Sequence, residues 1–145
     1  AGAFQGAVVR DALASVLERY ISQPLYRTAV LTSETGSSFA FLNFVSGKPF
    51  FQENENSNRF TEDAAFVIAA RANPTEVSSL LNSLGNFNNR AQKSILVGFE
   101  KGLKRAPDSF KKSAALSRAL ESASGKSADE LKSNFEKIKE SLKGS

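Results

Sequence analysis

The stretch Thr61–Arg105 predicts three short helices in series, each with its own start and stop signals. Asn73 precedes Pro74 at the start of the second helix, and Glu76 occupies its third position, a combination typical of a capped helix start. Gly85 supplies a stop signal. Between these signals four apolar residues follow at helical spacing: Val77, Leu80, Leu81 and Leu84. Because helices this short are unstable in isolation, the stretch predicts a stacked helical module and not a catalytic pocket.

The rest of the chain carries similar helix signals, with apolar residues at helical spacing between Pro, Gly or Ser breaks. The Phe-rich run 39–45 is the weakest of them, since it is also compatible with an extended strand. About eight helices are expected in all. Their ranges are Ala7–Ile21, Pro24–Ser33, Phe39–Val45 capped by Ser37 or Ser38, Glu62–Ala72 capped by Thr61, Asn73–Gly85, Asn89–Arg105, Asp108–Ser124 stopped by Gly125, and Leu131–Leu142 after a capping box at Ser127–Glu130.

Lys48–Asn58 is the one expected loop, because its second half is uniformly polar and would be costly to bury. Phe50 and Phe51 at its start are expected to dock back on the body of the protein. The spacing of its carboxylates does not match a calcium-binding EF-hand loop. The chain is therefore expected to be a single domain in four parts: first helices 1–47, polar loop 48–60, central three helices 61–105 and basic C-terminal helical pair 106–145.

The composition excludes several kinds of site. The 145 residues include no Cys, His, Trp or Met. A disulfide, a thiolate nucleophile and covalent haem attachment all need Cys, and His is the commonest general base and transition-metal ligand. We therefore expect no catalytic, cofactor-binding or metal site. No apolar run approaches the ~20 residues of a membrane-spanning helix. The absence of Met, including at position 1, leads us to expect a domain excised from a larger chain or a processed product.

Two features of the sequence indicate close packing. Gly98 and Gly102 lie four residues apart on one expected helix, a spacing that lets another backbone approach closely. Outside a membrane we interpret this spacing as a packing signal and not as a dimerisation motif. Six of the twelve Phe residues lie between positions 39 and 60, and most of them are expected to fill the core between crossing helices. The alternative is that some of them form an exposed apolar groove for a partner segment.

A family resemblance covers the segment Pro24–Arg105. Its helical phrases resemble the HEAT-like region of large bacterial extracytoplasmic proteins that join a "membrane-bound dehydrogenase" β-propeller to a c-type cytochrome. The phrases are Leu25–Ser33, Phe60–Ala72, Asn73–Val77 with the leucines that follow, and Gly98–Leu103. The resemblance implies a linker of stacked helices between redox-associated domains, in the periplasm or outside the cell. Since the family's haem-binding Cys-x-x-Cys-His motif is absent, no cytochrome function is implied.

Charge is unevenly distributed, because residues 1–89 have a net charge of −2 and residues 90–145 a net charge of +6. A possible basic binding surface consists of Arg90, Lys93, Lys101, Lys104, Arg105, Lys111 and Lys112. If these residues converge on one concave face, they would track nucleic-acid phosphates. The alternative is a solvated outer face whose charges favour the C-terminal end of the helix dipole. We favour this alternative, because no aromatic or amide array accompanies the charges to stack or read bases.

Together these features predict an all-α fold, specifically a HEAT/armadillo-like solenoid segment, because the tetratricopeptide and ankyrin signatures are absent. The expected function is non-catalytic: a structural linker or protein-interaction scaffold, with neighbouring domains or another chain as partners. By resemblance, the larger chain is an exported redox protein. Two alternatives remain: nucleic-acid binding through Arg90–Lys112, and a cofactor-independent hydrolase or lyase. The hydrolase or lyase needs a closed pocket with a carboxylate or Lys of strongly shifted pKa.

Overall fold

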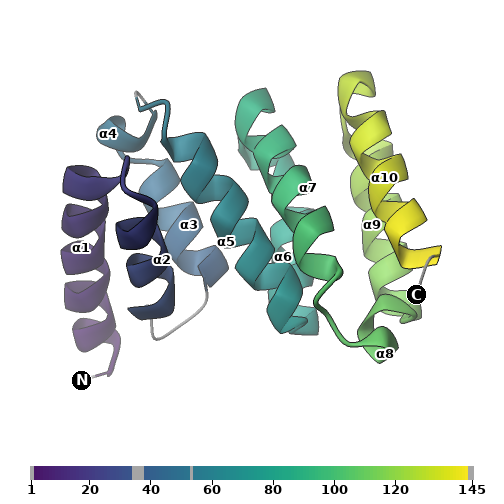
Figure 1. Cartoon of the computed structure of the whole chain (residues 1–145), viewed down its shortest axis with the longest axis horizontal. Helices are drawn as coiled ribbons and strands as arrows, with labels where there is room; N and C mark the ends of the chain where they lie inside the picture. Colours follow the sequence, from purple (N-terminus) through teal and green to yellow (C-terminus); the bar gives the residue numbers. More distant parts are fainter. Residues whose placement is uncertain (1, 34–37, 53, 144–145) are drawn as a thin grey trace.

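The computed structural model describes residues 2–33, 38–52 and 54–143, and every regular element within these ranges is a helix. The helices lie side by side in a row, with α1 and α10 at opposite ends (Figure 1). The elements are α1 (Gly2–Tyr20), α2 (Pro24–Ser33), α3 (Ser38–Ser46), α4 (Pro49–Gln52), α5 (Ser57–Arg71), α6 (Pro74–Asn82), the 3-10 helix η1 (Leu84–Asn86), α7 (Asn89–Leu103), α8 (Asp108–Lys111), α9 (Ala114–Lys126), the 3-10 helix η2 (Asp129–Leu131) and α10 (Lys132–Lys143). The prediction of an all-α chain is confirmed.

The described ranges contain ten α-helices, so the expected number of about eight is wrong. One additional helix, α4, forms inside the expected loop, where Phe51 is buried as predicted. The other arises because the expected helix 108–124 is divided into α8 and α9. The hydroxyl of Ser113 accepts a hydrogen bond from the Leu116 amide at 3.2 Å and caps a new helix start there.

Two predicted helix starts are confirmed by their hydrogen bonds. The Asn73 side chain accepts from the Glu76 amide at 3.0 Å and caps α6. Asn88 does the same for α7, accepting from the Ala91 amide at 2.8 Å. The Phe-rich run lies in the helix α3, which begins at Ser38. The alternative cap at Ser37 lies outside the described residues.

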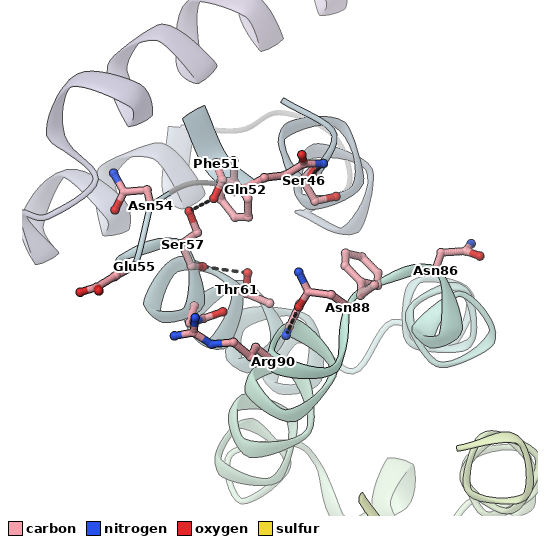
Figure 2. Close-up of a pocket in the computed structure, with 13 residues that line it drawn as sticks. Ser46, Phe51, Gln52, Asn54, Glu55, Ser57, Thr61, Asn86, Asn88 and Arg90 are labelled. Atoms are coloured by element: carbon pink, nitrogen blue, oxygen red, sulfur yellow. Dashed lines mark hydrogen bonds between the residues drawn. The ribbon is translucent and has the colours of Figure 1, made fainter. Parts of the chain in front are cut away.

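The predicted cap at Thr61 is wrong, because α5 begins one turn earlier, at Ser57 (Figure 2). Thr61 is buried inside the helix, where its hydroxyl donates to the Ser57 carbonyl oxygen at 2.8 Å. The helix starts early because Ser57 is also buried, and its hydroxyl donates to the Phe51 carbonyl oxygen. The polar end of the expected loop therefore belongs to a helix.

Three other predicted boundary signals are also wrong, two of them helix stops and one a helix start. Gly85 lies in η1, after α6 has already ended at Asn82, and Gly125 lies within α9. The expected capping box fails because the Ser127 hydroxyl donates back to the Ala123 carbonyl oxygen at 2.7 Å, at the end of α9. The predicted end of the preceding helix near Ala72 agrees with α5, which ends at Arg71 and has Ala72 as its C-cap in the left-handed conformation, with φ 57°. Glycine is the usual residue at such a position, and here Pro74, two residues later, is the local signal for the stop.

The helices form two layers. In one layer α2, α5, α7 and α10 each contact the next, and in the other α3, α6 and α9 do so (Figure 1). α3 also contacts α5 and joins the two layers, while α1 packs on α2 at one end. The most extensive contact is between α5 and α7.

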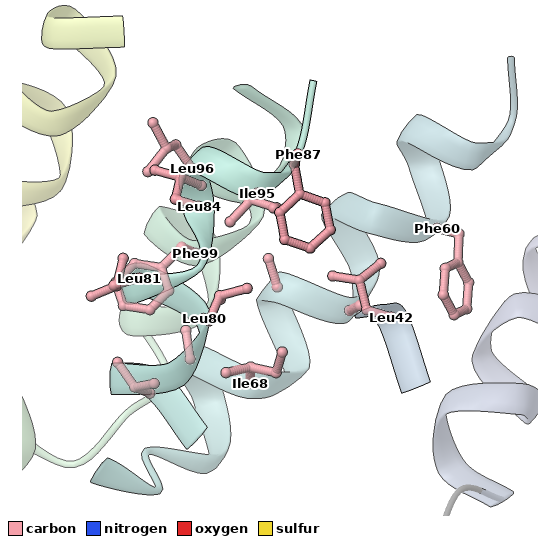
Figure 3. Packing of buried hydrophobic residues seen from close by; sticks show 14 of the residues in the cluster. Leu42, Phe60, Ile68, Leu80, Leu81, Leu84, Phe87, Ile95, Leu96 and Phe99 are labelled. Atoms are coloured by element: carbon pink, nitrogen blue, oxygen red, sulfur yellow. The ribbon is translucent and has the colours of Figure 1, made fainter. Parts of the chain in front are cut away.

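The apolar core is continuous through these layers, and Figure 3 shows its central part. Side chains from five elements meet there: Leu42, Phe60, Ile68, Leu80, Leu81, Leu84, Ile95, Leu96 and Phe99, all with relative exposure of 3% or less. Phe60 makes edge-on ring contacts with Phe41 and Phe51, with centroids 6.0 Å apart in both pairs. The Phe-rich segment therefore mainly fills the core between crossing helices.

The packing interpretation of Gly98 and Gly102 is confirmed. A Cβ atom at Gly98 would lie 2.0 Å from the Glu62 carbonyl oxygen, and one at Gly102 would lie 2.3 Å from that of Phe66. α7 therefore rests directly on the backbone of α5. Because both contacts advance by four residues, the two helices run in the same direction.

Candidate functional site

The predicted basic residues are distributed along the α7–α8 region. Arg90, Lys93 and Lys101 lie on α7, and Lys104 and Arg105 follow its last residue. Lys111 ends α8, and Lys112 comes next. Arg90 and Lys104 are separated by almost the whole length of a helix, roughly 20 Å at 1.5 Å per residue. The structure thus places these charges in a row and not in one cluster.

Three of these basic side chains interact with other residues of the protein. Lys101 donates a hydrogen bond to the Glu62 carboxylate at 2.6 Å, and this bond raises the pKa of Lys101 above its ordinary value. Lys111 forms an ion pair with Asp108 at 3.4 Å. The guanidinium of Arg105 lies 5.7 Å from the centre of the Phe66 ring. The basic surface is therefore partly neutralised or engaged in packing.

A polar cleft of about 430 Å³ lies between the α3–α5 region and the turn that leads into α7 (Figure 2). Phe51 and Phe87 contribute apolar surface to its wall. Its polar lining consists of Ser46, Gln52, Asn54, Glu55, Ser57, Asn58, Thr61, Asn86, Asn88 and Arg90. Of the predicted basic residues, only Arg90 belongs to this polar cleft. The five amide side chains were not predicted as site residues, although Asn recurs in the two turns 54–58 and 86–89.

Three of the cleft amides are held by hydrogen bonds to the backbone. Asn88 and Asn54 use their oxygen atoms, accepting from Ala91 and Asn56 respectively at 2.8 Å. Gln52 uses its nitrogen, donating to the Ser46 carbonyl oxygen at 3.3 Å. Each amide therefore keeps its other end for a ligand: an NH₂ group on both Asn side chains and an oxygen on Gln52.

A different surface lies at the first end of the row, where apolar side chains of α1 and α2 are exposed. Leu25 is 78% exposed and Val8 53%, and three others are about two-fifths exposed: Val9, Val16 and Tyr26. Tyr20 and Tyr26 stack there with ring centroids 4.2 Å apart. We call these residues the N-terminal apolar face. At the opposite end, the outward residues of α10 are charged, including Glu136, Lys137 and Glu140.

One buried arginine connects this end to the centre of the molecule. Arg27 on α2 is 5% exposed and donates to the Ile21 carbonyl oxygen at 2.8 Å and to the Asp63 carboxylate at 3.3 Å. Burial raises the pKa of Asp63 above its ordinary value of 3.8, although the hydrogen bond and the charge of Arg27 oppose the shift. Asp63 lies outside the polar cleft, and this arrangement is a structural link.

Two kinds of feature are absent from the described part of the chain. It contains no group of three or more acidic, His or Cys side chains placed to hold a metal ion. Within the same residues, no helix has both the length and the hydropathy needed to cross a lipid bilayer.

No protein-family model, curated protein or solved structure matches this chain. By its own geometry, the described part of the protein is all-α and consists of layered helices.

Proposed function

We propose that the chain is a segment of a HEAT-like solenoid that acts as a non-catalytic linker or protein-interaction scaffold. One observation carries this proposal: polar contacts between successive helices of one layer join residues at a regular sequence offset. Arg27 and Asp63 join α2 to α5 over 36 residues, Glu62 and Lys101 join α5 to α7 over 39, and Glu100 and Ser141 join α7 to α10 over 41.

The second layer supports the same interpretation. The Glu76 carboxylate on α6 accepts from the Phe39 amide on α3 at 3.2 Å, over 37 residues. A step near 40 residues matches the helical pair of HEAT-type repeats. α5 and α7 run in the same direction, as corresponding helices of successive repeats do. The residue types do not recur at this offset, so the proposed repeat lies in the arrangement of the helices and not in a sequence motif.

The scaffold function is supported by the difference between the two ends. Stacked repeats need a polar outer face wherever the stack meets water. The charged α10 end meets this requirement, whereas the N-terminal apolar face does not. We propose that this face is covered by one occupant, a preceding helical pair of the larger chain, which continues the same two layers.

Thiol labelling tests this proposal cleanly, because the chain contains no Cys. Leu25→Cys places a single thiol on the N-terminal apolar face, and Ser117→Cys places one on an exposed position of α9 as a control. We expect the thiol of Leu25→Cys to react at least tenfold more slowly in the product of the full open reading frame than in the 145-residue chain. The control thiol should react at equal rates in both. Equal rates for Leu25→Cys would overturn the proposal.

The nature of the larger chain is a separate proposal that rests on the family resemblance alone. It would be an exported redox protein in which these helices link a β-propeller to a cytochrome. The full open reading frame tests this directly. Propeller and haem-attachment motifs on either side of the helices would support it, and flanking sequence without them would refute it.

A nucleic-acid-binding function is the second candidate. It is favoured by Lys93, Lys104 and Lys112, which are exposed and form no ion pair with the other described residues. Binding through such charges must weaken steeply with salt. If this candidate is correct, DNA or RNA should retain the protein at low salt and release it at moderate salt. Retention that does not change with salt would exclude it.

A further inference from the structure

We propose that the polar cleft binds an extended, net-neutral peptide segment, whose backbone is recognised by the amide side chains of the cleft. This inference rests on the proposed scaffold function and names a second class of partner for it. It concerns a surface distinct from the N-terminal apolar face, because the cleft is formed by the α3–α5 region and the start of α7.

The hydrogen-bonding groups of the cleft match a peptide backbone. Each peptide unit offers one N–H donor and one C=O acceptor. The NH₂ groups of Asn54 and Asn88 are available as donors, and the oxygen of Gln52 is available as an acceptor, since the other end of each amide is bonded to the protein. These three amides are therefore held in place before a ligand arrives, which lowers the entropy cost of binding.

The charges of the cleft favour a neutral ligand. Among the described residues of its lining, the charged side chains are Glu55 and Arg90; both are exposed, and neither forms an ion pair with a described residue. Because these two charges have opposite sign, the described lining provides no net attraction for phosphate groups. They can instead pair with opposite charges on a segment whose own charges cancel.

The apolar part of the lining favours a peptide over a sugar. Sugar rings are commonly held against the open face of an aromatic ring. Phe51 and Phe87 are only 5% and 8% exposed, so neither ring offers a fully open face to the cleft. The small exposed area of each ring can contact a small apolar side chain of a peptide. The volume of about 430 Å³ lies within the range of ligand sites.

The experiment is a nuclear magnetic resonance titration of the 145-residue chain that follows the side-chain NH₂ signals of its Asn and Gln residues. The probe is an equimolar pool of hexapeptides built from Ala, Ser, Gln and Leu, with both termini blocked. We expect millimolar peptide to shift the signals of Asn54, Asn88 and Gln52. Maltotriose and inorganic phosphate, titrated separately, should leave these signals unchanged.

Two matched variants test the role of the amides. Asn88→Ser keeps a capping oxygen at the start of α7 but removes the NH₂ donor, so peptide affinity should fall about fivefold. Asn73→Ser makes the same change at the start of α6, outside the cleft, and should leave affinity unchanged. Both variants should melt at similar temperatures.

Three results would overturn the inference: no shift of the cleft signals by peptide, a response to maltotriose or phosphate in place of peptide, or equal affinities in the two variants. None of these results bears on the thiol labelling of Leu25→Cys at the N-terminal apolar face. Failure of this inference and failure of the proposed scaffold are therefore distinguishable.

Discussion

The α5–α7 contact and the N-terminal apolar face are built from similar amphipathic helices, yet they differ in what covers the apolar side. In the α5–α7 contact, Ile95 and Phe99 have no exposed surface, and the glycines of α7 touch the backbone of α5. At the N-terminal apolar face, Leu25 is 78% exposed. Apolar residues at helical spacing therefore do not by themselves fix how completely a helix is buried.

The difference lies in the small residues. Gly98 and Gly102 allow α7 to approach α5 so closely that the larger side chains beside them interlock. No such glycine contact is found among the described side chains of α1 and α2, and larger apolar side chains such as Leu25 are exposed there instead. The centre of the molecule should therefore depend strongly on side-chain volume, whereas the first end should depend on it weakly.

The largest expected effect is that of Gly98→Ala. The added Cβ would lie 2.0 Å from the Glu62 carbonyl oxygen, and a backbone atom cannot move aside without separating α5 from α7. We expect the free energy of unfolding to fall by about 3 kcal/mol, at the upper end of overpacking effects. Urea denaturation of the variant and the wild type measures this difference.

Gly125→Ala is the matched control for this prediction. Gly125 also lies inside a helix, α9, but a Cβ there meets no atom within 4 Å. Since Ala is the better helix former, this variant should be about 0.5–1 kcal/mol more stable than the wild type. Similar effects at the two glycines would contradict the view that close backbone contact distinguishes the centre.

An intermediate effect is expected where the two regions are joined, at Arg27. Arg27→Met keeps a long side chain but leaves the Ile21 carbonyl oxygen and the Asp63 carboxylate without this donor. The loss should be about 2 kcal/mol at neutral pH. Arg59→Met on the exposed side of α5 is the control and should change stability by less than about 0.5 kcal/mol.

The pH dependence of the Arg27→Met effect follows from Asp63. Its pKa is already raised in the folded protein, and removing Arg27 removes two causes that lower it. A carboxyl group whose pKa is higher in the folded protein than in the unfolded chain contributes most to stability below its pKa in the unfolded chain, near 3.8. It loses this contribution as the pH rises through its pKa in the folded protein. The destabilisation should therefore be smaller at about pH 3.5 than at about pH 7. An equal loss of stability at both pH values would show that Asp63 is not the partner affected by the loss of Arg27.

Much of the fold follows from local signals in the sequence. The Asn73 cap, the start of α7 at Asn89 and the close approach at Gly98 and Gly102 were all predictable, because each depends on residues adjacent in the chain or on one helix face. Errors arose where tertiary packing overrides local preference. Ser57 joins a helix because it is buried against the Phe51 carbonyl, which no local pattern indicates.

The candidate site was less predictable than the fold. The basic residues of 90–112 stood out by composition, but the structure directs Lys101, Arg105 and Lys111 to partners within the protein. The polar cleft was missed because it combines two Asn-containing turns that are far apart in sequence. Only the packing of α7 on α5 brings these turns together.

The smallest expected effect on stability comes from removing a charged side chain at the α5–α7 contact. It distinguishes the contribution of an ion pair from that of backbone packing. The Lys101–Glu62 ion pair borders the glycine contact, but the Lys101 side chain is 58% exposed. Lys101→Met should therefore lower the free energy of unfolding by only about 0.5 kcal/mol, and this loss should disappear in about 1 M salt.

The ion pair also predicts a pH dependence, because it raises the pKa of Lys101 in the folded protein. Its contribution to stability is fully present below pH 10.5, the ordinary pKa of the group, and is lost as the pH rises through the pKa of the folded protein. Lys104→Met, at an exposed position without an ion pair among the described residues, is the control and should have no measurable effect. A salt-independent loss at Lys101 near that of Gly98→Ala would mean that the ion pair, and not backbone contact, holds α7 on α5.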